Sequence, residues 1–401
     1  MSSGIFAEYA SADRCNSDLC RRLHASEPLL PIAPPFEEGL VNPCLRPSSK
    51  GKAACIPSVH VLGGWHSFVE EGLQPMMAAH EKLKMHDKLG ATCFNDWGED
   101  ASGPERWFGG WGVRPEADRM LVQQCIHLLS FYPAYPNGYL NAFLKAYWPC
   151  KTEEVNKLKA MGKEEGDYYG GAMWETCRPR ALAAHDQAIG TGGIGHELTP
   201  PFVMRTVYGD SGKHTPRLVA LLRSPTDRLE TSFWAHPHYP LRYGADADGF
   251  DKYVDEQTKG FAACEARHGV RRCAFLFEMI AKAHADVFFH ADQIIRGIYE
   301  PFVAEWRAAF PSSLLVLRAE DLYDHGEATR AKLCGFLGIE PPASSDGLPS
   351  LSYAQQHAAS LAKQDKAVPM HAHTRQKLAT FYRPHSQRLA ALLQDPKFAW
   401  E

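Results

Sequence analysis

The chain has 401 residues, of which 45% are apolar and 22% are charged, which is typical of globular proteins rather than disordered or fibrous ones. The 43 Lys and Arg residues against 47 Asp and Glu residues give a net charge of -4, so the overall charge does not favour nucleic-acid binding. No run of 18 apolar residues occurs, and the sequence therefore predicts no membrane span. The N-terminus lacks the pattern of a signal peptide, so we expect a cytoplasmic protein or a chain without its upstream anchor.

The 11 cysteines are too few for the disulfide scaffold of a mini-protein, and their odd number leaves at least one thiol unpaired. Neither the cysteines nor the 19 histidines show the spacing of a zinc site. The sequence predicts no bound metal.

In chain order, residues 1–54 are rich in Pro, Ser and Cys and are expected to form an irregular leader before one domain at 55–401. The first predicted strand is 59–62, and a helix is predicted from 68 to 86 after it. A loop rich in Gly and Trp follows. Residues 116–148 are predicted to be helical, and the charged segment 151–190 favours helix.

The second half alternates strands with helices. The apolar run 217–222 is typical of a strand buried on both faces of a parallel sheet. Helices are predicted within 274–308, a third strand at 313–317, a helix to about 337 and a last helix at 375–394. This alternation predicts an α/β fold with a mainly parallel sheet.

The carboxyl end of the second predicted strand carries a candidate anion site. Arg223 ends the strand, and Thr231 and Ser232 lie one to two turns into the following helix. A guanidinium and hydroxyl donors that converge on one point would suit a phosphate monoester. In a purely structural interpretation, Arg223 pairs instead with Asp227 or Glu230 at the start of that helix.

The segment 217–239 and the segment 296–339 together resemble the sulfotransferase family. The pattern R-x-P-x-x-R-x-x-T-S-F resembles the family's 3′-phosphate-binding motif, and G-x-Y…W…F…LLVLR-x-EDL…FLGI resembles its C-terminal half. The N-P-C and C-I-P triplets before the first strand and the tail F-Y-R-P…R-L…F-A-W resemble the carbohydrate sulfotransferase subgroup of the N-acetylgalactosamine 4-sulfate 6-O-sulfotransferases. The likeness runs from about residue 42 to 401.

The resemblance implies a P-loop-kinase-like parallel sheet and sulfuryl transfer from 3′-phosphoadenosine 5′-phosphosulfate to a hydroxyl of a glycan, without a metal. It implies that Arg223, with Thr231 or Ser232, holds the 3′-phosphate. A chondroitin-like or other polysaccharide acceptor follows from the resemblance alone, and the sequence does not indicate an oligomeric state.

The loop that should hold the 5′-phosphosulfate departs from the family pattern. The family has a strand and then G-x-x-K-[SC]-G-T-T-x-L, whereas here His66 stands where the Lys is expected, followed by Ser67. Gly90-Ala91-Thr92 resembles the missing second half. The loop is therefore predicted to be split by an insertion at about 68–89.

Three interpretations of this loop remain open. Lys88 could be the cation beside the Gly90 segment, or His66 and Ser67 could keep their register while Gly90 onward completes the cradle. The loop could also be broken and bind no donor. The difference matters because a neutral His would stabilise a leaving phosphate less than Lys does.

The candidate general base is Glu105, because P-E-R-W-F resembles a family segment whose Glu faces the acceptor; its alternative role is a surface carboxylate. The resemblance also places Cys264 and Cys273 as a disulfide if the protein is luminal, and so implies a Golgi or secretory location. Two buried free thiols are the alternative.

Two other functions compete with sulfuryl transfer. A kinase could share the fold, but the sequence holds no G-x-x-x-x-G-K-[ST] motif and phosphoryl transfer would need Mg²⁺. A non-catalytic descendant could have kept a glycan groove and lost the donor loop.

Overall fold

A computed structural model describes residues 39–45, 54–63, 66–85, 118–125, 129–130, 139–162, 176–184 without 178 and 182, 200–208, 214–280, 292–364 and 366–400. The strands in these residues are β1 (Cys44–Leu45), β2 (Ala54–Cys55), β3 (Val59–Gly63), β4 (Leu83–Met85), β5 (Met120–Gln124), β6 (Arg217–Leu222) and β7 (Leu314–Arg318).

The helices of the first half are η2 (Val69–Leu73, π-helical), α3 (Gln74–Ala78), α4 (Tyr139–Ala160) and α7 (Pro200–Tyr208). Those of the second half are α8 (Pro225–Ala235), α9 (His238–Tyr243), α10 (Ala247–His268), α11 (Val270–Ile280), α12 (Asp292–Ile295), α13 (Tyr299–Ala309), α14 (Ala319–Asp324), α15 (Gly326–Leu337), α16 (Tyr353–Ala362), α17 (Ala372–Leu393) and the 3₁₀ turn η5 (Pro396–Phe398).

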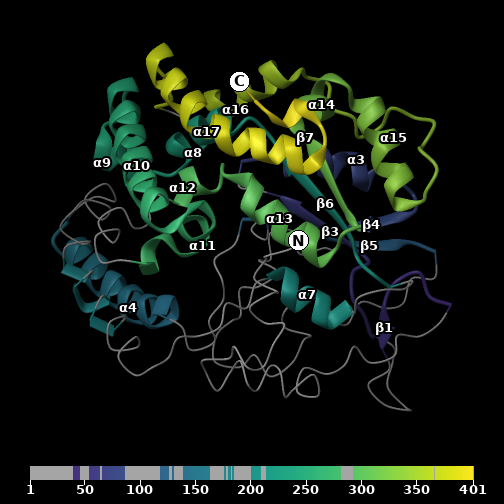
Figure 1. The fold of residues 1–401 in the computed structure, drawn as a ribbon, viewed down its shortest axis with the longest axis horizontal. Helices are drawn as coiled ribbons and strands as arrows, with labels where there is room; N and C mark the ends of the chain where they lie inside the picture. Colours follow the sequence, from purple (N-terminus) through teal and green to yellow (C-terminus); the bar gives the residue numbers. More distant parts are fainter. Residues whose placement is uncertain are drawn as a thin grey trace.

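A parallel sheet forms the centre of the molecule, with its five strands in the order β4-β5-β3-β6-β7 (Figure 1). Counted along the chain this order is 2-3-1-4-5, so the first strand of the sheet lies in its middle. After β3 the chain continues to β4 and β5, which lie on one side of it, and after β6 it continues to β7 on the opposite side of the sheet. The predicted α/β fold with a P-loop-kinase-like parallel sheet is confirmed.

Strand β6 shows why the sheet is buried on both faces. Successive side chains of a strand point to opposite faces, so Leu218, Ala220 and Leu222 join one apolar cluster while Val219 and Leu221 join another. All five side chains are fully buried. The continuous apolar run is therefore the pattern of a strand covered by helices on both sides.

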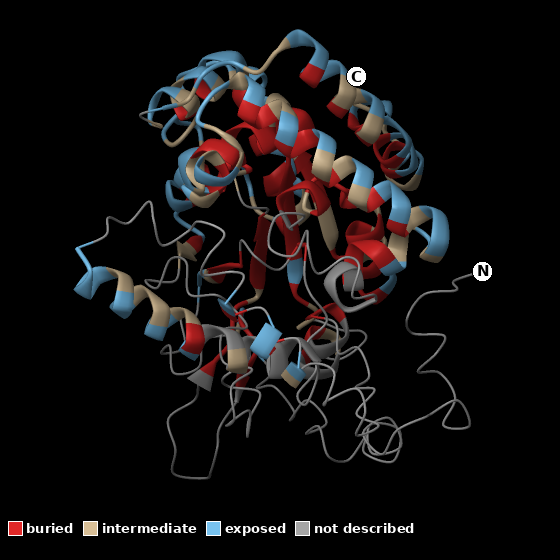
Figure 2. Ribbon diagram, turned by 90° about the vertical axis from the view of Figure 1, so that its left-hand side faces the viewer, coloured by how far each residue is buried: buried red, intermediate tan, exposed pale blue. Residues whose placement is uncertain are grey.

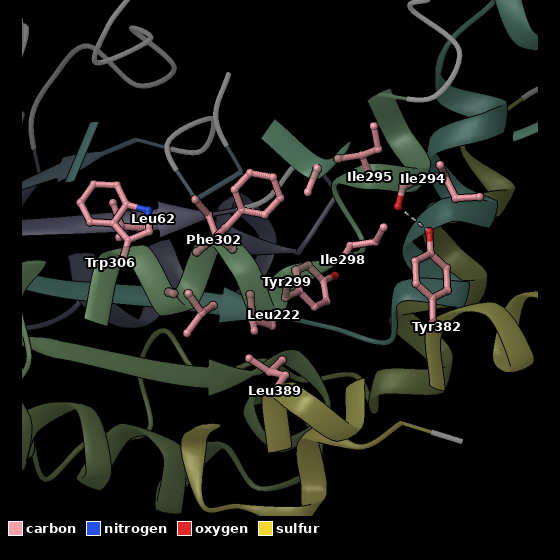
Figure 3. Packing of buried hydrophobic residues seen from close by; sticks show 14 of the residues in the cluster. Leu62, Leu222, Ile294, Ile295, Ile298, Tyr299, Phe302, Trp306, Tyr382 and Leu389 are labelled. Atoms are coloured by element: carbon pink, nitrogen blue, oxygen red, sulfur yellow. Dashed lines mark hydrogen bonds between the residues drawn. The ribbon is translucent and has the colours of Figure 1, made fainter. Parts of the chain in front are cut away.

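Two groups of helices supply that cover. Side chains of α8, α10, α11, α12, α13 and α17 pack on one face, and those of η2, α3, α14 and α15 pack on the other. In Figure 2 the central strands are red, which marks buried residues, and the surrounding helices carry their exposed residues, in pale blue, on the outside. Figure 3 shows the first face, where Phe302 and Trp306 of α13 lie in the cluster of Leu62 and Leu222.

Two predicted helices differ from the structure. Residues 120–124, inside the helix predicted at 116–148, form β5, which pairs with β3 on one side and β4 on the other. The helix predicted at 68–86 ends at Ala78, and β4 follows at the edge of the sheet. Pairing with neighbouring strands satisfies the backbone of both segments and overrides their local helix pattern.

The stretch 68–85, which falls in the predicted insertion, therefore contributes a helix and an edge strand to the domain. Part of the predicted leader is also attached to the domain. Asn42 is fully buried and donates to the carbonyl of Arg119 at 2.8 Å, while its amide oxygen accepts from the N–H of Leu121 at 2.8 Å. Whether the leader ends at residue 54 and whether 68–89 interrupts a loop stay predictions.

Three disulfides lie in the described residues, and they join Cys44 to Cys55, Cys150 to Cys177 and Cys264 to Cys273. The pairing expected for α10 and α11 is thus confirmed. Cys334 is a buried free thiol, as an odd cysteine count requires of at least one residue. Within the residues that the structure describes, none of the helices is both long and apolar enough for a membrane crossing.

Candidate functional site

The candidate site lies at the carboxyl ends of β3 and β6, which are neighbours in the sheet. These two strands continue toward opposite edges, so they flank the point where the strand order reverses. Ligands of open α/β sheets bind in the crevice that forms at this point. The first strand leads into the His66–Phe68 turn, and the second leads into Arg223 and α8.

The turn after β3 has an unusual backbone. His66 has a φ of 61° and Phe68 a φ of 65°, so both are in the left-handed region that non-glycine residues rarely adopt. Between them, Ser67 is buried. Such conformations persist where surrounding contacts hold them, and they gather at ligand sites.

Arg223 provides one of those contacts, since its Nη1 donates to the carbonyl of His66 at 2.9 Å. The Arg223 Nε donates to the Tyr353 hydroxyl at 3.3 Å, and Nη2 donates to Nδ1 of His357 at 2.8 Å. Its guanidinium carbon also lies 3.9 Å from the centre of the Phe68 ring. The side chain has no exposed surface, so a ligand can reach it only if the groups that cover it move.

A network of charged side chains continues beyond Arg223. The Nε2 atom of His357 lies 3.2 Å from a carboxylate oxygen of Glu230, whose other oxygen accepts the backbone N–H of Met370 at 2.9 Å. Arg375 donates to Glu230 at 3.3 Å and to Asp227 at 2.7 Å. The two carboxylates of α8 are therefore bonded by side chains of α16 and α17, with Arg375 of α17 as the cation, and neither pairs directly with the arginine at the end of β6.

Asp227, Glu230 and His357 lie close enough together to hold a metal ion. In the described residues, however, each of them already bonds to a cation or a hydrogen-bond donor. Arg375 supplies positive charge to both carboxylates, which is the role a metal would take. These contacts fit an ion-pair network better than a metal centre.

Positive charge dominates the surroundings of His66. Burial, together with the charges of Arg228, His236, Arg223 and Arg296, lowers the pKa of His66 to about 3. Its ring also meets that of His236 edge-on at 5.5 Å between centroids. His66 is therefore neutral at pH 7 in the free protein, and the four described side chains whose charges lower its pKa are all basic.

An anion placed among these groups would offset their mutual repulsion. The carboxyl ends of β3 and β6 thus form a buried electropositive site, the kind of environment that suits phosphate or sulfate groups.

The two predicted hydroxyl residues have other partners. Thr231 donates to the carbonyl of Asp227 at 3.1 Å, and Ser232 donates to that of Arg228 at 2.8 Å, both one turn earlier in α8. Ser232 also accepts from Arg228 at 3.3 Å. The structure thus brings Arg223 to His66, whereas the hydroxyls bond within their own helix.

Five of the predicted site residues cannot be placed. Lys88, Gly90, Ala91, Thr92 and Glu105 lie outside the described residues. Their roles in holding the donor or in taking the acceptor proton stay predictions.

No family model matches the chain. Over 204 residues, half of this chain, it is 26% identical to "Carbohydrate sulfotransferase 15" of Homo sapiens and 25% identical to the protein of that name in Mus musculus. The predicted resemblance to the carbohydrate sulfotransferases is confirmed. The match spans about a third of the length of these curated relatives, 34% in each case.

Two solved sulfotransferase structures are also similar to the chain. The crystal structure of a sulfotransferase from Alicyclobacillus acidocaldarius covers 84% of this chain at 13% identity and a TM-score of 0.41, with 96% of its own chain matched. The sulfotransferase domain from the curacin biosynthetic pathway covers 85% at 14% identity and a TM-score of 0.26, with 98% of its own chain matched. At these scores the fold assignment rests on the strand order of the chain itself.

Proposed function

We propose that the chain is a sulfotransferase that moves a sulfuryl group from 3′-phosphoadenosine 5′-phosphosulfate to a hydroxyl of a carbohydrate. The observation that carries the proposal is the buried group of basic side chains at the carboxyl ends of β3 and β6, in a chain that resembles carbohydrate sulfotransferases. The donor carries phosphate and phosphosulfate groups, and the basic side chains at the strand ends would supply matching positive charge.

In this proposal the acceptor oxygen attacks sulfur while the bond from sulfur to the phosphate oxygen breaks. Glu105 takes the proton of the acceptor hydroxyl, and 3′-phosphoadenosine 5′-phosphate leaves. Arg223 holds the 3′-phosphate together with Thr231 or Ser232, whose hydroxyls must then turn from the carbonyls that they bond in the free chain. No metal takes part.

The cation beside the leaving phosphate is Lys88 in this proposal. His66 is the other candidate, but its pKa of about 3 leaves it uncharged in the free protein. Ser67 and Gly90-Ala91-Thr92 would complete the cradle with their N–H groups. A bound phosphate would raise the pKa of His66, which gives it a supporting role once the donor is present.

A carbohydrate acceptor comes from the names of the similar proteins and from the resemblance, and a glycosaminoglycan or other polysaccharide fits it. The three disulfides favour an oxidising compartment, so we include a Golgi or secretory location in the proposal.

Calorimetric titration with 3′-phosphoadenosine 5′-phosphate tests the donor site. We expect micromolar binding by the native chain and a loss of about 100-fold in Arg223→Lys, which keeps the charge but loses the planar fork. Lys88→Ala should also weaken nucleotide binding relative to the native chain if Lys88 is the cation. Arg242→Lys is the matched control, because Arg242 pairs with Glu256 on the surface at 3.2 Å and should change nothing.

Absence of binding by the folded native chain contradicts the donor site. Binding of a polysaccharide without binding of the nucleotide would support the non-catalytic glycan-binding alternative. Transfer of ³⁵S from the labelled donor to chondroitin, without added metal, then tests the reaction itself.

A further inference from the structure

Helix α16 meets the candidate site through polar contacts. Its buried residues are Gln356 and Ser360, and Tyr353 and His357 reach from its first half toward α8 and the end of β6. Ser352 caps the helix reciprocally with Gln355, which fixes its first turn. The face that α16 turns to the site is therefore a hydrogen-bonding surface rather than an apolar one.

The His357 ring lies between the guanidinium of Arg223, which is always a donor, and the carboxylate of Glu230. Its Nδ1 lies 2.8 Å from Nη2 of Arg223, and its Nε2 lies 3.2 Å from an oxygen of Glu230. A guanidinium can only donate and an ionised carboxylate can only accept. The neutral His357 ring must therefore accept at Nδ1 and carry its proton on Nε2.

We propose that His357 is a positioning residue that holds Arg223 in the orientation needed for the phosphate, and that its protonation releases this hold in acid. The proposal rests on the proposed function, because it takes Arg223 as the group that meets the 3′-phosphate. The proposed reaction assigns His357 no direct contact with the donor or the acceptor.

The count of N–H groups supports a positioning role. Arg223 has five N–H groups, and its contacts with Tyr353, His66 and His357 use one on each nitrogen. Within the described part of the chain, one N–H on each terminal nitrogen is left for a phosphate, which is the pair that a bidentate contact needs. Loss of the His357 contact would leave Nη2 of Arg223 without the hydrogen bond that fixes its position.

Protonation removes that contact directly. A proton on Nδ1 of His357 turns the acceptor into a donor that faces the N–H of Arg223, and it sets two positive charges side by side. The other charged groups around the ring are Asp227 at 3.8 Å, Glu230 at 3.2 Å and Arg375, which bonds both carboxylates. The imidazolium would be drawn to the carboxylates and away from Arg223.

The test compares the pH dependence of 3′-phosphoadenosine 5′-phosphate binding in the native chain, His357→Gln and His357→Leu between pH 7.5 and 5.5. Glutamine can accept from Arg223 through its oxygen and donate to Glu230 through its nitrogen, yet it does not titrate. Leucine can do neither. A phosphate monoester itself gains a proton near pH 6, and this effect is common to all three proteins.

At pH 7.5 we expect His357→Gln to bind within about threefold of the native chain and His357→Leu to bind about tenfold more weakly. As the pH is lowered, the native chain should lose more affinity than His357→Gln, because only the native chain can place a proton on Nδ1 at this position. Circular dichroism at each pH verifies that the variants are folded, and the Gln variant alone decides the outcome if His357→Leu does not fold.

Identical pH profiles of the native chain and His357→Gln would overturn the inference while leaving the donor site intact. Tighter binding by His357→Leu would also overturn it, since His357 would then compete with the phosphate. No binding by the native chain at any pH would refute the proposed function instead.

Discussion

The C-terminal tail is tied to the turn that presents Arg223. Trp400 donates its indole N–H to a carboxylate oxygen of Glu320 at 2.8 Å, and the same oxygen accepts the backbone N–H of Ser224 at 2.7 Å. Tyr299 donates to the carbonyl of Arg223 at 3.0 Å, and its ring centre lies 5.8 Å from that of Trp400. The substitution Trp400→Phe keeps a ring in this place and removes the N–H.

The loss of stability expected in Trp400→Phe depends on whether the Glu320 carboxyl is ionised. Only 15% of the Glu320 side chain is exposed, and burial raises the pKa of its carboxyl despite the opposing charge of Arg318. A hydrogen bond to a charged group contributes about 1.5–3 kcal/mol, and one to a neutral group about 1 kcal/mol. We expect Trp400→Phe to lower the free energy of unfolding by about 1.5–3 kcal/mol at pH 7.

Urea unfolding at pH 7 and at pH 4 measures this loss. Because Glu320 is protonated below its raised pKa, the loss should shrink toward about 1 kcal/mol at pH 4. Phe398→Leu is the control, since Phe398 packs in the same tail and its side chain offers Glu320 no hydrogen bond, so its effect should not depend on pH. A loss below about 0.5 kcal/mol for Trp400→Phe, or an equal loss at both pH values, would refute the reasoning.

Two further predictions concern stability. Replacing Cys264 and Cys273 with Ala opens a loop with a sequence separation of 9 and should lower the free energy of unfolding by about 2.6 kcal/mol in urea, a difference that vanishes when reductant opens the native disulfide. Burial lowers the pKa of His60 to about 3 and that of His385 to about 4, so the unfolded chain takes up protons below about pH 6.5 that the native chain does not. Stability should therefore fall as the pH drops from 6.5 to 4, by about 1.4 kcal/mol per pH unit for each histidine, and an unchanged slope in His385→Gln would contradict this.

Sequence reasoning singled out Arg223 but not the residues that surround it in the structure. The sequence pattern indicated Arg223 because an apolar strand precedes it and a proline and a helix follow it. A charged residue at the end of a buried strand suggests a ligand site. Tyr353 and His357 were missed, since they are 130 and 134 residues away from Arg223 and lie on a short polar helix. The S-x-x-Q capping pattern before α16 predicts the helix start but says nothing about what the helix contacts.

The sequence by itself determined three of the five strands of the sheet. β3, β6 and β7 are largely apolar runs, and such runs can be recognised without knowledge of their neighbours; β3 and β6 are the ones buried on both faces. It also determined the start of α8, where Ser224 caps the helix and Pro225 occupies its first position. In these segments the local chemistry and the final structure agree.

Only the tertiary structure decided the state of β4 and β5 and the surroundings of Arg223. β4 has three residues and β5 is partly polar, and the hydrogen bonds that make them strands include those between β5 and β3, which lie far apart along the chain. Arg223 is held by residues from the turn after β3 and from α16, which meet only when β3 and β6 pair and α16 packs on α8. Contacts of this kind depend on chain closure over more than 100 residues, and local sequence patterns do not encode them.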